Sequence, residues 1–196
     1  MDNVELNIEK TKTTQKTNQI IVVIKDKIYL YNKINEKWHK EIESDCIYGK
    51  NGYSINRQEG DYTTPIGSFE LLYAFGTEEN PNTQMKYKKI LNTSYYSQDK
   101  NKKDEYNRWI ESNKKIDGEH LIEYPKQYHY AIVIGFNINP VVVGKGSSIF
   151  LHVKGEKNYT EGCIAVDESV MIDIFSKIRD GAYIIMVENL EEIMNY

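Results

Sequence analysis

Alternating apolar and polar positions predict β-strands in the first part of the chain. The run IIVVIKDKIYLYNK, which begins at Ile20, is rich in β-branched residues and tyrosine, and it reads as two short strands around Lys25-Asp26-Lys27. The segment KWHKEIES continues this pattern, and Lys50-Asn51-Gly52 supplies a turn signal. We therefore expect strands joined by tight turns up to about residue 75.

The strand pattern returns in the last third of the chain and is followed by one helix. Strands are predicted in YHYAIVIGF, from Tyr128, and in PVVVGKGSSIFLHV, from Pro140. Asp167 is a good helix N-cap, Asp180-Gly181 closes the helix, and AYIIMV reads as a last strand. The apolar positions of this helix recur at helical spacing: Val170, Met171, Ile174, Phe175 and Ile178. The chain is thus expected to be mostly β with a late helix.

Two polar segments interrupt this pattern. The polar composition of residues 1–19 predicts a linker or a disordered N-terminal segment. Residues 76–125 predict a long excursion with one or two short helices. Because a structureless loop of that length is unusual, we expect an inserted lid or substrate-facing element, with a solvated decoration as the alternative. Residues 20–196 then form a single domain.

Composition excludes some classes of partner. The chain has 196 residues and a formal net charge of −4, with lysines and acids mixed along it, which argues against a nucleic-acid partner because such a partner favours a basic face. No apolar run approaches the roughly 18 residues of a membrane helix. Whether a signal or a membrane anchor has been removed stays open. The few arginines, Arg57, Arg108 and Arg179, read as the coding bias of an AT-rich genome.

The stretch YTEGCIAV carries the first candidate chemistry. Its Cys163 is one of only two cysteines, and the glycine before it lets the backbone approach a substrate and free amides for an oxyanion. A thiol reacts as its thiolate and needs a base, and His152, at the end of the strand-like SSIFLHV, is well placed in the sequence to be one. The alternatives are a buried, inert cysteine and a structural histidine. Cys46 either bridges Cys163 or is independent of it.

A second motif lies upstream, in EGDYTTPIGSFEL from Glu59 to Leu71. Pro65 fixes its backbone angle, Gly67 permits a close turn, and SFELL begins a strand. Taken alone, this motif indicates a rigid loop scaffold and no particular chemistry.

The two motifs together resemble the L,D-transpeptidase catalytic domain, the YkuD-like family. The matching positions are Gly60, Asp61, Thr64, Pro65, Gly67 and Phe69, then His152, then Thr160-Glu161-Gly162-Cys163. The resemblance runs from about Ile20 to about Val187 and implies a β-rich sandwich or barrel-like sheet with the cysteine in a groove near its rim. It also implies a cysteine-dependent acyltransferase of bacterial peptidoglycan, working outside the cytoplasmic membrane at the cell wall and open to acylation by carbapenems.

The resemblance also implies residue roles. Cys163 would be the nucleophile, His152 the base, and the backbone amides of Gly162 and Cys163 the oxyanion donors. The thiolate would attack a tetrapeptide stem, release D-alanine and pass the acyl group to an amine of a neighbouring stem, giving a 3-3 cross-link. Donor and acceptor stems are then the partners, and no cofactor or metal is needed. The alternatives are an L,D-carboxypeptidase that hydrolyses the same bond and a catalytically weak cell-wall binding module.

This chain departs from the family pattern beside the cysteine. The family commonly has a histidine where this chain has Glu161, and often an arginine or asparagine where it has Ala165. These differences predict an altered substrate preference rather than a dead enzyme.

Further residues are weaker candidates. Thr160, Glu161, His120 and Tyr130 are candidates for substrate binding, while His39 is expected at the surface. Tyr128 and Tyr130 are expected to share one strand face, where the alternatives are lining the groove and a structural role, the second being favoured for both. A zinc site is not expected, because zinc needs about four closely spaced ligands and the chain has no CxxC or HxxxH pair.

Overall fold

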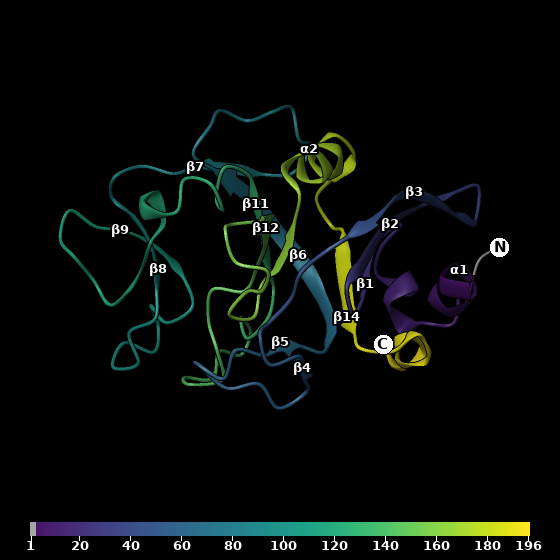
Figure 1. Ribbon diagram of the computed structural model, residues 1–196, viewed down its shortest axis with the longest axis horizontal. Helices are drawn as coiled ribbons and strands as arrows, with labels where there is room; N and C mark the ends of the chain where they lie inside the picture. The colour runs from purple at the N-terminus through teal and green to yellow at the C-terminus, as the bar shows by residue number, and fades with distance from the viewer. Residues whose placement is uncertain (1–2) are drawn as a thin grey trace.

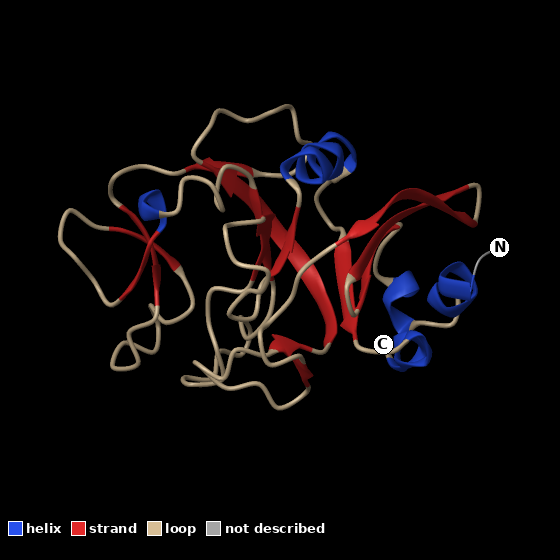
Figure 2. Cartoon of the chain, viewed as in Figure 1, coloured by secondary structure: helices blue, strands red, loops and turns tan. Residues whose placement is uncertain are grey.

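The computed structural model describes residues 3–196 and is mainly β (Figures 1 and 2). The strands are β1 Gln19–Ile24, β2 Lys27–Ile34, β3 Lys37–Asp45, β4 Tyr53–Ser54, β5 Thr64–Pro65, β6 Gly67–Gly76, β7 Tyr87–Lys89, β8 Ser94–Ser97, β9 Trp109–Glu111, β10 Gly118–His120, β11 Ala131–Ile134, β12 Phe150–Val153, β13 Ile164–Val166 and β14 Tyr183–Val187. The helices are α1 Asn3–Ile8 and α2 Glu168–Lys177, with 3-10 turns η1 Lys12–Gln15, η2 Leu121–Glu123 and η3 Leu190–Asn195.

One nine-stranded sheet organises the fold. Its strands run in the order β13-β12-β11-β6-β14-β1-β2-β3, and β7 pairs with β6 off this path. The pairs β1–β14 and β12–β13 are parallel, and the other neighbours along this order are antiparallel. The sheet twists strongly and curls along this order (Figure 2). The expectation of a mainly β fold with a barrel-like sheet and a helix after the cysteine motif is confirmed.

The helices cover the sheet because each has an apolar side. Met171, Ile174 and Phe175 of α2 recur at helical spacing and pack into a core with strand residues such as Leu151 and Ile184. A second core lies where α1 and η3 meet β1, β2 and β14, and it includes Ile8, Ile20, Val22, Tyr31, Trp38 and Ile193.

The late helix follows the sequence pattern with two differences. It begins after Asp167 as expected, but the Asp167 side chain makes no capping hydrogen bond and instead pairs with Lys154 at 3.3 Å. It ends at Lys177, short of Asp180-Gly181, because Ile178 already has an extended backbone with ψ of 146°. Ile178 stays buried, so its place in the apolar pattern is explained by packing rather than by helix.

The N-terminal segment differs from the expected linker. Residues 1–2 lie outside the described residues, and residues 3–15 hold α1 and η1. Val4 and Ile8 are four positions apart on one face of α1, and both are buried. The Lys12 amide also donates to the carbonyl of Tyr196. Two apolar residues in a polar stretch are a weak sequence signal, but they suffice to fix a short helix on a core.

The middle excursion, where one or two short helices were expected, consists mainly of a small sheet and holds one short 3-10 helix. Strands β8, β9 and β10 form a separate three-stranded sheet in the order β10-β8-β9, at the left of Figure 1, and η2 is a single 3-10 turn. Tyr96 packs edge-on against Phe150 at 4.9 Å between ring centroids, and Trp109 packs edge-on against Phe75 at 5.5 Å. Aromatic contacts thus fix this sheet beside the β11–β12 end of the main sheet.

The predicted strand after Pro140 forms only at its end. Residues 140–149 lie outside any strand, and β12 begins at Phe150. The Asn137 side chain explains the irregular part, because it accepts from the Val142 amide at 2.8 Å and donates to the carbonyls of Val142 and Gly146 at 2.9 and 2.8 Å. Similarly, YHYAIVIGF forms a strand only over Ala131–Ile134. Within residues 3–196, none of the helices has the length and apolar character needed to cross a membrane.

Candidate active site

Cys163 and His152 come together through a pair of parallel strands. His152 lies on β12 opposite Ala165 of β13, and Cys163 immediately precedes β13. Both side chains line one cavity of about 380 Å³. The other lining residues include Glu119, Tyr124, Lys126, Gln127, Tyr128, Glu156, Lys157, Tyr159, Thr160 and Glu161. The cysteine is therefore half-buried at the wall of a cavity rather than sealed in the core.

The Cys163 thiol is held in a neutral form. Its Sγ accepts from the Phe150 amide at 3.3 Å and donates to the Ser148 carbonyl at 3.2 Å. Burial, followed by the charge of Glu119, raises the pKa of the thiol to about 12, against smaller lowering by the Phe150 amide and Arg57. At neutral pH the sulfur therefore keeps its proton and needs a base to become a nucleophile.

His152 has the protonation state that a base requires. Its Nδ1 lies 2.7 Å from the Val153 carbonyl, and a carbonyl only accepts, so Nδ1 carries the proton and Nε2 holds a lone pair. The side chain is 7% exposed, and burial lowers its pKa to about 4. The ring of Tyr128 meets it edge-on at 5.7 Å between centroids and fixes its plane. His152 is thus a neutral imidazole at physiological pH.

Thr160 shapes the turn that carries the cysteine. Its hydroxyl donates to the Cys163 carbonyl at 2.6 Å and accepts from the Gly162 amide at 3.1 Å. The Gly162 amide, one of the two expected oxyanion donors, is therefore already engaged. Gly162 has a φ of +137°, and a Cβ there would lie 2.3 Å from Nη1 of Arg57. Glycine is required at this position both for the backbone angle and for the close approach.

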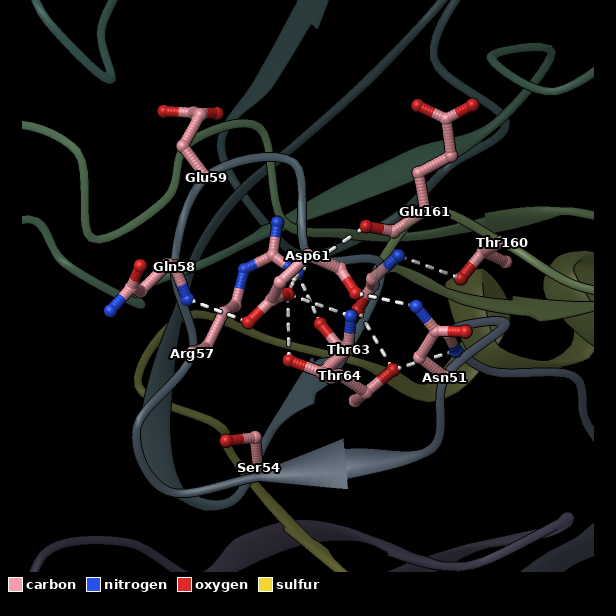
Figure 3. A network of polar contacts seen from close by, with 12 residues as sticks. Asn51, Ser54, Arg57, Gln58, Glu59, Asp61, Thr63, Thr64, Thr160 and Glu161 are labelled. Atoms are coloured by element: carbon pink, nitrogen blue, oxygen red, sulfur yellow. Dashed lines mark hydrogen bonds and ion pairs between the residues drawn. The ribbon is translucent and has the colours of Figure 1, made fainter.

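The upstream motif is hydrogen-bonded to the turn that carries the cysteine. The Thr64 hydroxyl donates to the Gly162 carbonyl at 3.0 Å and accepts from the Gly49 amide at 2.9 Å. Asp61 closes the loop on itself by accepting from the amides of Gln58 at 2.7 Å and Thr63 at 2.8 Å (Figure 3). The two motifs, distant in sequence, are thus one hydrogen-bonded unit.

Arg57 is a residue of this unit that the sequence analysis missed. It is 5% exposed, and its Nη1 donates to the Thr63 carbonyl and, at 3.3 Å, to the Glu161 carbonyl, with Asp61 as ion-pair partner at 3.4 Å. Figure 3 shows the Glu161 carbonyl directed at this network and its carboxylate directed away. The guanidinium lies under the cysteine turn, and its charge lowers the pKa of Cys163. In the sequence, Arg57 was interpreted only as one of three arginines, and no local pattern indicated that it would lie beside the cysteine turn.

The other predicted site residues divide into two groups. Thr160 and Glu161 line the cavity, whereas His120 and Tyr130 do not belong to its lining. His120 stacks on Tyr95 at 4.3 Å between centroids and bonds the Asn92 carbonyl at 2.8 Å, which holds it within the small sheet. Tyr130 packs against Phe175 of α2 at 5.3 Å between centroids, because residues 128–130 precede β11 and do not alternate as a strand.

Glu119 is a cavity residue that had no assigned role, and Tyr128 lines the same cavity, which is one of the two alternatives expected for it. Glu119 is on β10, next to His120, and accepts a hydrogen bond from the Tyr128 hydroxyl. Burial raises the pKa of Glu119 to about 7. A glutamate in a polar stretch gives no sequence signal, because only the fold brings β10 close to the cysteine.

The second cysteine is separate from the site. Cys46 is buried, both cysteines are free thiols, and the Cys46 thiol approaches the Lys25 carbonyl at 3.8 Å. His39 is exposed, as expected. Among residues 3–196, no three His, Cys, Asp or Glu side chains gather as a metal site.

Comparison with solved structures finds similar chains at low sequence identity, and the first of the three described here shares the fold. The helical cell shape determining protein Pgp2 from Campylobacter jejuni is 15% identical, with a TM-score of 0.50, and the match covers 98% of this chain and 60% of that one. Bd1075 from Bdellovibrio bacteriovorus is 16% identical, with a TM-score of 0.48 over 94% of this chain and 56% of that one. Mycobacterium tuberculosis L,D-transpeptidase 1 is 17% identical, with a TM-score of 0.43 over 87% of this chain and 61% of that one.

The chain thus spans 56% to 61% of the length of these structures. No curated protein sequence matches it significantly. The model of the L,D-transpeptidase catalytic domain matches residues 17–187, which include both motifs, the cavity and every element except α1, η1 and η3. This match covers most of the chain, and we conclude that the chain belongs to the YkuD family of L,D-transpeptidase catalytic domains.

Proposed function

We propose that this chain is a peptidoglycan L,D-transpeptidase with Cys163 as nucleophile and His152 as base. The thiolate attacks the carbonyl of the third residue of a tetrapeptide stem and releases the terminal D-alanine. The acyl group then passes to an amine of a neighbouring stem, which gives a 3-3 cross-link. The observation that carries this proposal is that the Cys163 thiol and the neutral His152 imidazole line the same cavity in a chain of this family. The substrate then places the protein at the bacterial cell wall, outside the cytoplasmic membrane.

The geometry suits general-base catalysis rather than a resting ion pair. In the structure the thiol donates a hydrogen bond to the Ser148 carbonyl. The S–H bond must therefore rotate toward the lone pair on Nε2 of His152 before the sulfur can attack. The imidazolium that forms keeps its Nδ1 hydrogen bond to the Val153 carbonyl and later returns a proton to the leaving D-alanine amine. Because the Gly162 amide is engaged by Thr160, we assign the oxyanion to the Cys163 amide.

A catalytically weak cell-wall binding module is the second candidate. The observation that favours it is the thiol itself, which has a raised pKa and donates to Ser148. A module of this kind would hold stem peptides in the same cavity without turning them over.

Purified tetrapeptide muropeptides and product mass analysis separate these functions. Wild-type protein is expected to release D-alanine and form 3-3 dimers, Cys163→Ala to form neither product, and Cys46→Ala, altered at the buried thiol outside the cavity lining, to remain active. D-alanine release without dimers identifies the carboxypeptidase. Binding without any product identifies the module. Product formation by Cys163→Ala overturns the proposal.

A further inference from the structure

Glu119 is an acidic group on the wall of the cavity that holds the thiol. Its position is fixed, because β10 pairs Glu119 with Tyr96 of β8, and Tyr96 packs against Phe150, whose amide bonds the Cys163 sulfur. Its carboxylate accepts from the Tyr128 hydroxyl, and the Tyr128 ring meets His152 edge-on. Glu119 is therefore connected to both the nucleophile and the base through rigid aromatic groups.

The Glu119 carboxylate lacks a cationic partner. Across residues 3–196, no lysine, arginine or histidine forms an ion pair with it, and its one side-chain hydrogen bond comes from a neutral phenol. Lys126 and Lys157 line the same cavity, but neither forms an ion pair with Glu119, and the nearby acids Glu161 and Glu59 disfavour its ionisation. A half-buried carboxylate without an ion-pair partner is costly for the fold, so its presence in the cavity that holds the nucleophile calls for a physical reason.

This carboxylate opposes the chemistry of the thiol in the empty site. After burial, the charge of Glu119 is the largest influence that raises the pKa of Cys163, while Arg57 acts in the opposite direction from beneath the turn. A cation placed against Glu119 would cancel its negative field and let the thiolate form more readily. The amine of a stem peptide is protonated at neutral pH, so it is a cation that could neutralise Glu119 in this way.

We propose that Glu119 recognises an aliphatic ammonium group of the donor stem peptide, and that neutralisation of Glu119 by this group activates Cys163. The inference rests on the proposed function, because it names a specificity residue for the same cavity. We assign the ammonium to the donor stem because the thiol must be activated before any acyl group exists to transfer. In the empty protein the carboxylate keeps the thiol unreactive toward other electrophiles.

The first experiment measures thiol reactivity and requires no turnover. Alkylation of Cys163 by neutral iodoacetamide is followed by mass spectrometry with peptide mapping, at pH 7.5 and constant ionic strength. Glu119→Gln, which keeps the shape of the side chain, is expected to react about threefold faster or more than wild type. The matched control is Glu123→Gln, which removes an equal charge from η2 at a residue outside the cavity lining, and it is expected to react at the wild-type rate.

The same assay tests the cation directly. In wild-type protein, n-butylammonium is expected to accelerate alkylation, whereas n-butanol, which has the same length and no charge, is not. In Glu119→Gln the effect of n-butylammonium is expected to vanish. Equal basal rates in the wild type and Glu119→Gln, or an acceleration that survives in Glu119→Gln, overturns the proposal.

A second experiment distinguishes the donor amine from the acceptor amine. D-alanine release is measured without an acceptor, from a donor tetrapeptide with a free side-chain amine and from the same peptide acetylated there. Wild-type protein is expected to prefer the free amine about tenfold or more, and Glu119→Gln to lose that preference, as expected for removal of a charged hydrogen-bond partner. A donor preference that Glu119→Gln leaves intact, with only its ratio of transfer to hydrolysis changed, contradicts assignment to the donor.

The two proposals fail in different ways. Release of D-alanine by Cys163→Ala would refute the proposed function. The effect of Glu119 on the alkylation of Cys163 is measured without turnover and would be judged separately. Conversely, normal muropeptide products from an enzyme whose alkylation rate ignores both Glu119 and n-butylammonium remove only the role of Glu119.

Discussion

At the scale of single residues, the protonation states of Cys163 and His152 set how the site responds to pH. Burial raises the pKa of the thiol to about 12 and lowers that of the imidazole to about 4. His152 has a folded pKa below its usual value, so its base form is present above about pH 4 and is lost as pH falls through that value. Both reacting groups are therefore neutral across the physiological range.

This pairing predicts a specific effect of His152→Ala. Without the base, Cys163 must ionise alone, so its acylation by a carbapenem is expected to fall by about 10²-fold at pH 7. The residual rate should rise about tenfold per pH unit, because the thiolate fraction does so below the thiol pKa. Intact-mass kinetics from pH 5 to 9 measure both slopes. The acylation rate of the wild type should not rise tenfold per pH unit. If the rate rises equally with pH in the wild type and in His152→Ala, the base is another group.

Arg57 acts on Cys163 as a positioning residue. Removing its charge and hydrogen bonds in Arg57→Met is expected to slow alkylation of Cys163 by about tenfold, since the guanidinium lowers the pKa of the thiol and holds the Glu161 carbonyl. Arg57→Lys keeps the charge and should recover part of the rate. Thermal unfolding of both variants is the control, because a purely structural role predicts that alkylation follows stability rather than charge.

At the scale of elements, regular periodicity was informative and isolated contacts were not. The strands from Ile20 and the helix after Asp167 were predictable, because their apolar residues recur at strand or helix spacing. The Gly-Cys turn and the upstream turn were also recognisable, since each needs particular residues such as Gly162 and Thr64. Glu119 and Arg57 were not, because each reaches the site through long-range packing that no local pattern records.

The first helix shows how little apolar area fixes an element. Ile8 is fully buried in the core formed with Trp38 and Ile193, although it lies in a polar stretch. Ile8→Ala is expected to reduce the free energy of unfolding by about 2–4 kcal/mol through lost burial and a residual cavity. Urea denaturation measures this value, with the exposed Leu6→Ala as the matched control, which should change it by less than about 0.5 kcal/mol. Similar values for both would mean that α1 does not contribute to the core.

At the scale of the whole molecule, the candidate active site is assembled from three distant parts of the chain. The upstream turn brings Arg57 and Thr64, the small middle sheet brings Glu119, and the β12–β13 pair brings the thiol and the imidazole. The order of the motifs indicated the family, but it did not indicate that the middle segment would supply an acidic wall.

The position of β14 has a consequence for biosynthesis. This last strand lies between β1 and β6, and it joins the two halves of the large sheet through a parallel pair on one side and an antiparallel pair on the other. A nascent chain that has not yet exposed β14 to solvent presents two unpaired strand edges, which are prone to non-native association. The large sheet is consequently completed only after β14 has been synthesised, and deletion of this strand should be more damaging than its length of five residues suggests.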